Sequence, residues 1–193
     1  MSTPLTLARV PDFVEAPPVL DATTLRQAFG HYPSGVVAVG AHVGGQLVGI
    51  AASSFTSVSL DPPLVSVAVS STSNTWPALR EAGEIGVSVL ADHHDVVCRQ
   101  LAGPADQRFA GLRFAVSSGG AVLLRESVAT FTTLLHDEIE AGDHVIALLR
   151  IVAVDAGEGE HPLVFHRSAF AQLDRRGLDP ARLDGRINGQ PVE

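Results

Sequence analysis

The sequence contains no lysine, and its 13 basic side chains are all arginine. With 21 acidic residues the formal net charge is −8. This argues against a general nucleic-acid binder, since such proteins neutralise phosphates with Lys and Arg. Cys98 is the only cysteine, which excludes an intrachain disulfide and a cysteine-cluster metal site. Apolar runs such as 35–41 and 64–69 are about as long as a strand, far short of the roughly 20 residues of a membrane-spanning helix.

The 193 residues suit one domain, and an apolar fraction of 46% suffices for a buried core. Residues 1–20 contain four prolines and no sustained periodicity, so we interpret them as an N-terminal extension. They also lack the pattern of a secretory signal, which favours a cytoplasmic location. The pattern of a folded domain covers 21–173. Residues 174–193 are rich in Arg, Asp and Gly and predict a polar C-terminal tail that is solvated or lies over a neighbour.

Short apolar segments at roughly even spacing, with few helices between them, predict a mainly β protein with an antiparallel barrel rather than βαβ units. The run 64–69 predicts a strand buried on both faces. Helices are expected at 22–29, capped by Asp21, and at 92–101, with a helical turn at 76–81. Strands are expected at 37–41, 47–52, 55–60, 64–69, 85–90, 121–124, 128–136, 144–154 and 163–165.

Hydroxyl side chains are dense in two segments, 53–59 and 70–75, each of which follows a predicted strand. Hydroxyls and free backbone N–H groups at strand ends can hold an anion without help from lysine. A phosphate site of this kind would fit an acidic protein. The alternative is that these residues cap turns, where serine is common.

Three histidines and the cysteine are residue types that often act in catalysis or metal binding. His144 follows Asp143 at the start of a long predicted strand, where the aspartate could hold the imidazole towards a cleft; the alternative is an exposed turn histidine. His93 and His94 lie in the second predicted helix, where adjacent side chains point in different directions, so no metal site is expected. Cys98 lies on the apolar side of the same helix and is expected in the core.

Several motifs together resemble one protein family. Residues 29–36 read FGHYPSGV, 49–63 read GIAASSFTSVSLDPP, 141–144 read AGDH and 162–165 read PLVF. In this order and spacing they resemble the flavin reductase-like proteins, which are FMN-binding split barrels. The resemblance extends from about residue 25 to about residue 173.

The resemblance implies a split β-barrel that forms a homodimer with flavin bound near the subunit interface. It also implies an activity: hydride transfer from NADH or NADPH to FMN or FAD, with the reduced flavin passing to a partner monooxygenase. The protein would need only to stack and orient the two cofactors, since these carry the chemistry. Two alternatives stay open, a flavin-binding carrier or sensor without reductase turnover, and a dimeric barrel that acts only in protein interaction.

The resemblance also implies roles for individual residues. Pro33, Ser34, Gly35 and Val36 would border the flavin ring, and Ala51, Ala52, Ser53 and Ser54 would line the ring and its ribityl chain. Ser57, Ser73, Asn74 and Thr75 would be donors at the phosphate, Phe109 would flank the pocket, and His144 would lie near the nicotinamide or flavin edge. The sequence departs from the family at Ala51, where threonine is usual. It also lacks the lysine that sometimes serves the phosphate, which leaves Arg108 or an arginine of the partner as a substitute.

Overall fold

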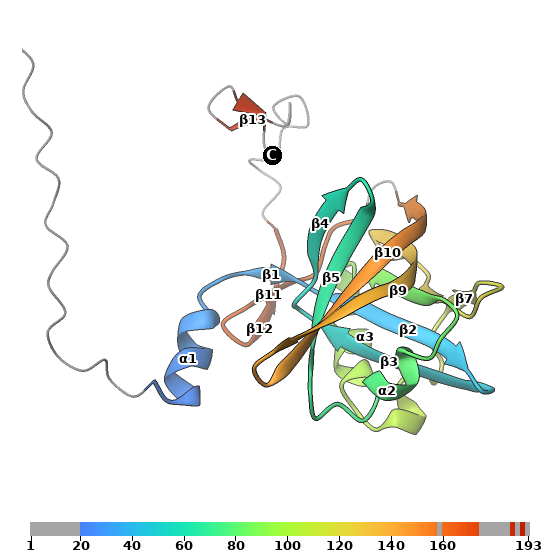
Figure 1. Cartoon of the computed structure of the whole chain (residues 1–193). Coiled ribbons are helices and arrows are strands. Elements are labelled where there is room, and N and C mark those ends of the chain that lie inside the picture. The colour runs from blue at the N-terminus through green and yellow to red at the C-terminus, as the bar shows by residue number, and fades with distance from the viewer. Residues whose placement is uncertain (1–19, 158–159, 174–185, 188–189, 192–193) are drawn as a thin grey trace, which may run out of the picture.

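The computed structural model describes residues 20–157, 160–173, 186–187 and 190–191 (Figure 1). A seven-stranded antiparallel sheet forms the body, in the order β3-β2-β6-β9-β10-β5-β4. The prediction of a mainly β, antiparallel fold with few short helices is therefore confirmed. The strands of this sheet are β2 (Val37–Val43), β3 (Gln46–Ala52), β4 (Thr56–Leu60), β5 (Pro63–Ser70), β6 (Ile85–Val89), β9 (Ala129–Ala141) and β10 (His144–Ala156). No helix in the described part of the chain is long and apolar enough to cross a membrane.

The two edges of the sheet meet at Ser54, two residues beyond the end of β3. Its hydroxyl donates a hydrogen bond to the carbonyl of Ala68 on β5 at 2.8 Å and accepts one from the Ala68 N–H at 3.0 Å. Because β3 ends the sheet on one side and β5 with β4 ends it on the other, these bonds roll the sheet towards a barrel.

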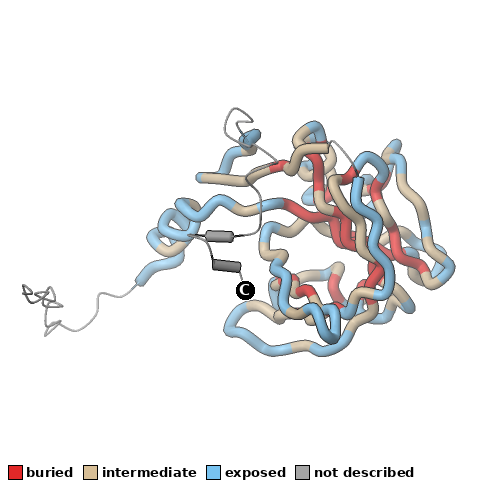
Figure 2. The backbone as a smooth tube through the Cα atoms, turned by 90° about the horizontal axis from the view of Figure 1, so that it is seen from above, coloured by how far each residue is buried: buried red, intermediate tan, exposed pale blue. Residues whose placement is uncertain are grey.

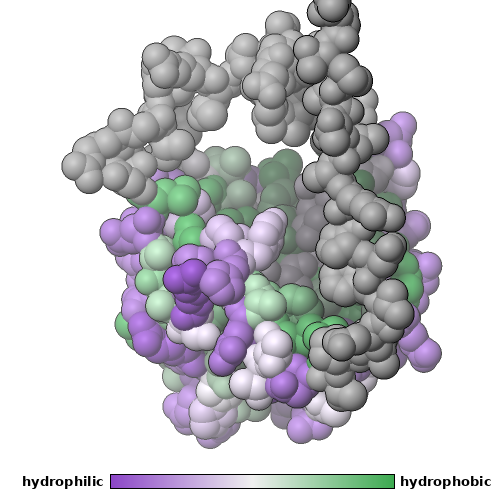
Figure 3. All heavy atoms as spheres, turned by 90° about the vertical axis from the view of Figure 1, so that its left-hand side faces the viewer, coloured by the Kyte–Doolittle hydropathy of each residue, from purple (hydrophilic) through white to green (hydrophobic). Residues whose placement is uncertain are grey.

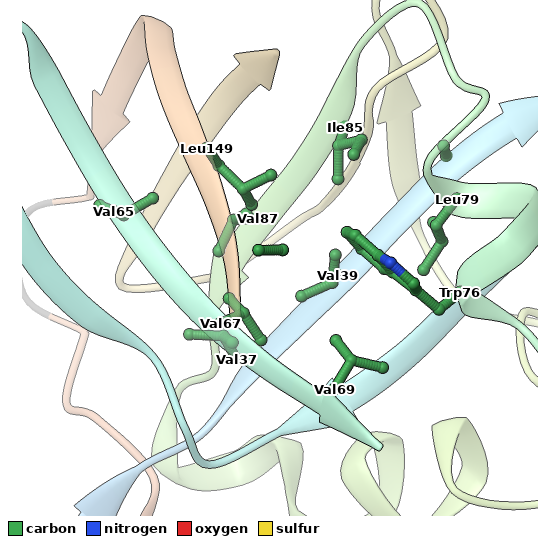
Figure 4. Close-up of a cluster of buried hydrophobic side chains, with 12 residues drawn as sticks. Val37, Val39, Val65, Val67, Val69, Trp76, Leu79, Ile85, Val87 and Leu149 are labelled. Atoms are coloured by element: carbon green, nitrogen blue, oxygen red, sulfur yellow. The ribbon is translucent and has the colours of Figure 1, made fainter. Parts of the chain in front are cut away.

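The interior of this rolled sheet is an apolar core whose side chains alternate along each strand. Trp76 closes one end, with its indole N–H donating to Glu138 at 2.7 Å, as a buried tryptophan requires. It belongs to α2 (Trp76–Leu79), shorter than the helical turn predicted at 76–81. Figure 4 shows the core residues Val37, Val39, Val65, Val67, Val69, Trp76, Leu79, Ile85, Val87 and Leu149.

A second core lies on the other face of β2 and β6, so these two strands are buried on both faces. The prediction that segment 64–69 is buried on both faces is wrong. In β5 only Val65, Val67 and Val69 are buried, because the second core does not extend over this strand. The second core consists of Val36, Ala38, Leu90, Leu101, Phe109, Val122, Leu124 and Leu163.

The helix predicted at 92–101 is two elements, the 3₁₀ turn η1 (Asp92–His94) and α3 (Asp95–Leu101). The expectation that His93 and His94 diverge is also wrong, since their ring centroids are 4.3 Å apart. His94 has φ −90° and ψ 17°, outside the α-helical region. Its Nδ1 accepts a hydrogen bond from the Ala91 N–H at 3.1 Å, which turns its ring back over η1.

Helix α1 (Ala22–Phe29) has the predicted bounds and the predicted cap. Asp21 accepts hydrogen bonds from the backbone N–H groups of Thr23 and Thr24, and these bonds and one from the Thr24 hydroxyl lower its pKa. No residue of α1 is buried, and the helix projects from the body of the molecule (Figures 1 and 2).

Some element bounds differ from the predicted ones, and several short strands were not predicted. Strand β9 continues five residues beyond the predicted end at His136, so the β9–β10 turn is only Gly142-Asp143. Residues 1–19 and most of the predicted tail lie outside the described residues. The remaining elements are β1 (Ser34–Gly35), η2 (Ala105–Gln107), β7 (Phe114–Val116), β8 (Val122–Leu124), β11 (Val164–His166), β12 (Ala169–Ala171), β13 (Arg186–Ile187) and β14 (Gln190–Pro191).

Candidate functional site

Two adjoining hollows contain five of the residues to which a flavin-binding role was assigned. The first, of about 170 Å³, is lined mainly by apolar side chains and lies over the end of β3. The second, of about 370 Å³, lies between α1, β1 and the β11–β12 hairpin. Ser53 and Phe165 border both hollows. The assigned residues in their walls are Ser34, Val36, Ala51, Ala52 and Ser53, which come from two separate segments.

Backbone hydrogen bonds hold together the elements that surround the larger hollow. Ser34 pairs with Phe165 and Gly35 pairs with Val164, so β1 is fixed against β11. The Arg167 N–H donates to the Gly30 carbonyl at 3.0 Å and ties the end of α1 to the same hairpin. Pro33 is exposed just before β1. Figure 3 shows this side of the molecule, where apolar surface lies among polar side chains.

Arg108 organises a second region, next to the first along β3. Its Nε–H donates to the Gly103 carbonyl at 2.9 Å, and its Nη1 donates to the Gly49 carbonyl at 2.8 Å and to the Thr75 hydroxyl at 2.7 Å. The guanidinium therefore joins the loop after α3, the middle of β3 and the hydroxyl-rich segment that follows β5. Gly49 is two residues from Ala51, so this region adjoins the smaller hollow.

No carboxylate among the described residues compensates the charge of Arg108. All three of its acceptors are uncharged, and no ion pair joins it to a residue in the described ranges. Its Nη2 makes no hydrogen bond to those residues either. A half-buried guanidinium with a fixed orientation and a free edge is suited to binding an anion.

The hydroxyls beside Arg108 have protons available for such an anion. Thr75 uses its oxygen to accept from Arg108, and Ser73 uses its oxygen to accept from the N–H groups of Thr75 and Trp76, at 3.3 and 3.2 Å. Each hydroxyl can still donate its own proton. Asn74 lies between them and is exposed. Of the four residues assigned to the phosphate, Thr75 thus contacts Arg108, Ser73 is hydrogen-bonded to Thr75, and Asn74 lies between these two in the chain.

Two assigned hydroxyls stand apart from this group. The Ser54 hydroxyl already bonds both backbone groups of Ala68 and so acts in closing the sheet. Ser57 is exposed on β4 opposite Val65, three residues along β5 from Ala68. A hydroxyl-rich sequence locates these residues near strand ends, but it does not indicate which hydroxyls the fold has already paired.

His144 is half-exposed at the start of β10, where it pairs with Ser70 of β5 and does not line either hollow. Its Nδ1 lies 2.7 Å from the carboxylate of Asp143. This hydrogen bond lowers the pKa of Asp143, to which the charges of His144 and of Arg26 on α1 also contribute. Asp143 therefore stays ionised and fixes the ring of His144 with Nε2 facing away.

Phe109 is 9% exposed and packs in the second core against Phe114. Its ring lies over the paired glycines Gly40 and Gly49, which have no side chains to displace it. Sequence reasoning assigned no role to Phe165 or Phe170, although the PLVF motif contains the first. Both rings border the smaller hollow, their centroids 5.6 Å apart.

Comparison with known proteins identifies the family of this chain. Residues 29–174 match the model of the flavin reductase like domain. A flavin reductase of Pseudomonas putida is 36% identical over 152 residues, which are 78% of this chain and 89% of that protein. An actinorhodin polyketide dimerase of Streptomyces coelicolor is 38% identical over 79% of this chain and 87% of its own length.

A solved structure, the NADH:FAD oxidoreductase SgcE6 of Streptomyces globisporus C-1027 in complex with NAD and FAD fragments, superposes with a TM-score of 0.77 at 29% identity. The match covers 81% of this chain and 95% of that one. The chain therefore belongs to the flavin reductase like family.

Proposed function

We propose that this protein is an NAD(P)H-dependent flavin reductase that supplies reduced FMN or FAD to a partner monooxygenase in the cytoplasm. Relatives named flavin reductase, NADH:FMN oxidoreductase and monooxygenase reductase subunit support the activity. The observation that carries the proposal is the charge of Arg108, which no carboxylate in the described part of the chain pairs, next to the Thr75 hydroxyl and an apolar hollow.

The residues present fit a flavin nucleotide. A flavin has an apolar ring at one end and a phosphate at the other, and the hollow lined by Val36, Ala51 and Phe165 adjoins the anion site at Arg108. When bound, the flavin supplies an acceptor for the hydride of a reduced nicotinamide. The chain's own part is to hold the ring against Ala51 and Ala52, to neutralise the phosphate and to exclude water. The usual threonine is absent at Ala51, so the flavin hydrogen bond of that side chain is either lost or supplied by a backbone group.

His144 is proposed as a positioning residue for the nicotinamide. Its Nδ1 is held by Asp143, which leaves Nε2 free to donate to or accept from a carboxamide or a flavin oxygen. Because His144 lies outside the two hollows of one chain, this role fits a site completed by a second chain. We therefore propose a homodimer, with the unburied α1 in its interface.

The direct test is NADH and NADPH oxidation at 340 nm by the purified protein with FMN and with FAD, followed by transfer of the reduced flavin to an unrelated flavin-dependent monooxygenase. Turnover with at least one pair is expected. Flavin binding without NAD(P)H oxidation would favour the carrier or sensor alternative. Absence of flavin binding in a fluorescence titration would leave only a structural or interaction role.

A further inference from the structure

A cluster of potential metal ligands lies outside the candidate flavin site. His93 and His94 of η1 and Glu126 of the β8–β9 connection each place a potential ligand atom within 4.8 Å of the others. The three residues border a hollow of about 240 Å³. We propose that His93, His94 and Glu126 form a binding site for a divalent transition-metal ion of the zinc type, which links η1 to the β8–β9 connection.

The orientation of His93 is the main argument. Its Nε2 lies 3.9 Å from Glu126 Oε2, while its Nδ1 lies 3.5 Å from Asp92 and 3.7 Å from Glu160. These distances are too long for direct hydrogen bonds. A metal-bound histidine commonly directs its second ring nitrogen to a carboxylate, which fixes the ring and raises its basicity. The second nitrogen of His93, Nδ1, faces two carboxylates in the same sense, at distances longer than a hydrogen bond, while Nε2 faces Glu126.

The charges around the cluster also favour a cation. Three carboxylates, those of Asp92, Glu126 and Glu160, surround His93. Arg113 pairs with Glu126, and Arg125 borders the same hollow, so negative charge remains in excess. Two imidazoles and a carboxylate are a ligand set that suits Zn²⁺, Co²⁺ and Ni²⁺ better than the harder Mg²⁺ or Ca²⁺.

His94 must reorganise to bind. Its Nδ1 accepts a hydrogen bond from the Ala91 N–H, which leaves the ring proton on Nε2. His94 therefore joins the site by exchanging this hydrogen bond for a metal bond, whereas His93 and Glu126 already face each other.

The test uses the untagged full-length protein, freed of metal by a chelator and titrated with Zn²⁺ in a calorimeter. We expect one Zn²⁺ per chain with micromolar or tighter affinity, and visible absorption bands from bound Co²⁺. His93→Gln and Glu126→Gly should each weaken Zn²⁺ binding at least tenfold. Glu126 has a φ of 61°, which glycine adopts without strain, so this variant removes the carboxylate and still suits the backbone.

His42→Gln is the matched control, since His42 is an exposed histidine on β2 outside the cluster. It should bind Zn²⁺ as the natural protein does. Zn²⁺ should also raise the melting temperature of the natural protein and of His42→Gln, but not that of His93→Gln. No binding at micromolar Zn²⁺, or equal losses in His42→Gln and His93→Gln, would overturn the proposal.

Discussion

Ser54 and Arg108 are both polar residues near β3, but the fold leaves them with different capacities to bind a ligand. The Ser54 hydroxyl uses its proton and one lone pair on Ala68. Arg108 uses three N–H groups on uncharged acceptors, and its charge and its Nη2 have no partner among the residues that the structure describes. Arg108 can therefore bind a phosphate more strongly than Ser54 can, because a charge-assisted hydrogen bond is roughly twice as strong as a neutral one.

Replacing Arg108 by glutamine tests this difference. Arg108→Gln removes the charge beside Thr75, and we expect the Kd for FMN to rise about 10- to 100-fold, the equivalent of one hydrogen bond to a charged group. Riboflavin, which has no phosphate, should bind both proteins equally. The measurement is quenching of flavin fluorescence. A similar loss for riboflavin would show that Arg108 supports the fold of the loops and not the phosphate.

His144 allows a second residue-level prediction. Since Asp143 fixes the ring and leaves Nε2 free, His144→Ala should lower the rate of hydride transfer in stopped-flow reduction of bound flavin by about tenfold or more. Flavin affinity should change little, because His144 does not line either hollow. His136→Ala, at an exposed position on β9, is the control. An unchanged rate in His144→Ala would remove this residue from the reaction.

Among the elements, strand β3 connects the core to the candidate site. Gly49 pairs with Gly40 on β2, and the Phe109 ring packs over both glycines. The Gly49 carbonyl accepts from Arg108, the residue before Phe109. The absence of side chains at Gly40 and Gly49 leaves a groove on the sheet for the Phe109 ring. The position of the Arg108 guanidinium therefore depends on this groove.

Gly49→Ala should disturb both the stability and the site. A Cβ at this position would lie 2.6 Å from the Phe109 ring and 2.8 Å from the Val39 carbonyl oxygen, so the ring and the strand must move. We expect a loss of about 1–3 kcal/mol in the free energy of unfolding, measured in urea, and weaker FMN binding as Arg108 shifts. Gly35→Ala is the matched control for stability, since nothing lies within 4 Å of its Cβ. Equal stabilities of the two variants would contradict this account of the groove.

Sequence patterns predicted most elements because alternation and turn residues are local signals. They failed where the outcome depends on distant packing. Segment 64–69 is apolar throughout, but only tertiary structure decides that the second core covers β2 and β6 and leaves one face of β5 open. The break at His94 depends on one hydrogen bond from Ala91. In the site, the sequence located the hydroxyls of Ser54 and Thr75 but not their partners, which are 14 and 33 residues away.

At the scale of the whole molecule, many large apolar side chains of the described residues are exposed to solvent in a single chain. Helix α1 buries none of its residues, and Phe29 and Tyr32 are 70% and 79% exposed. Apolar residues also remain exposed on the long β9–β10 ribbon, at Ile139, Val152 and Val154. An isolated eight-residue helix is marginal in water, so α1 needs packing partners for stability. Large apolar side chains left exposed in this number are a feature of proteins that associate.

A second copy of the chain is the partner that the proposed site requires, because His144 lies outside the hollows of its own chain. We therefore expect sedimentation equilibrium to give twice the 20.2 kDa mass of one chain. Phe29→Asp should shift the equilibrium to monomer by placing a charge in the interface, and NADH oxidation should fall as dimer is lost. Val96→Asp is the matched control, since Val96 is 65% exposed on α3. A monomeric natural protein would exclude the dimer, and equal dissociation of both variants would remove α1 from the interface.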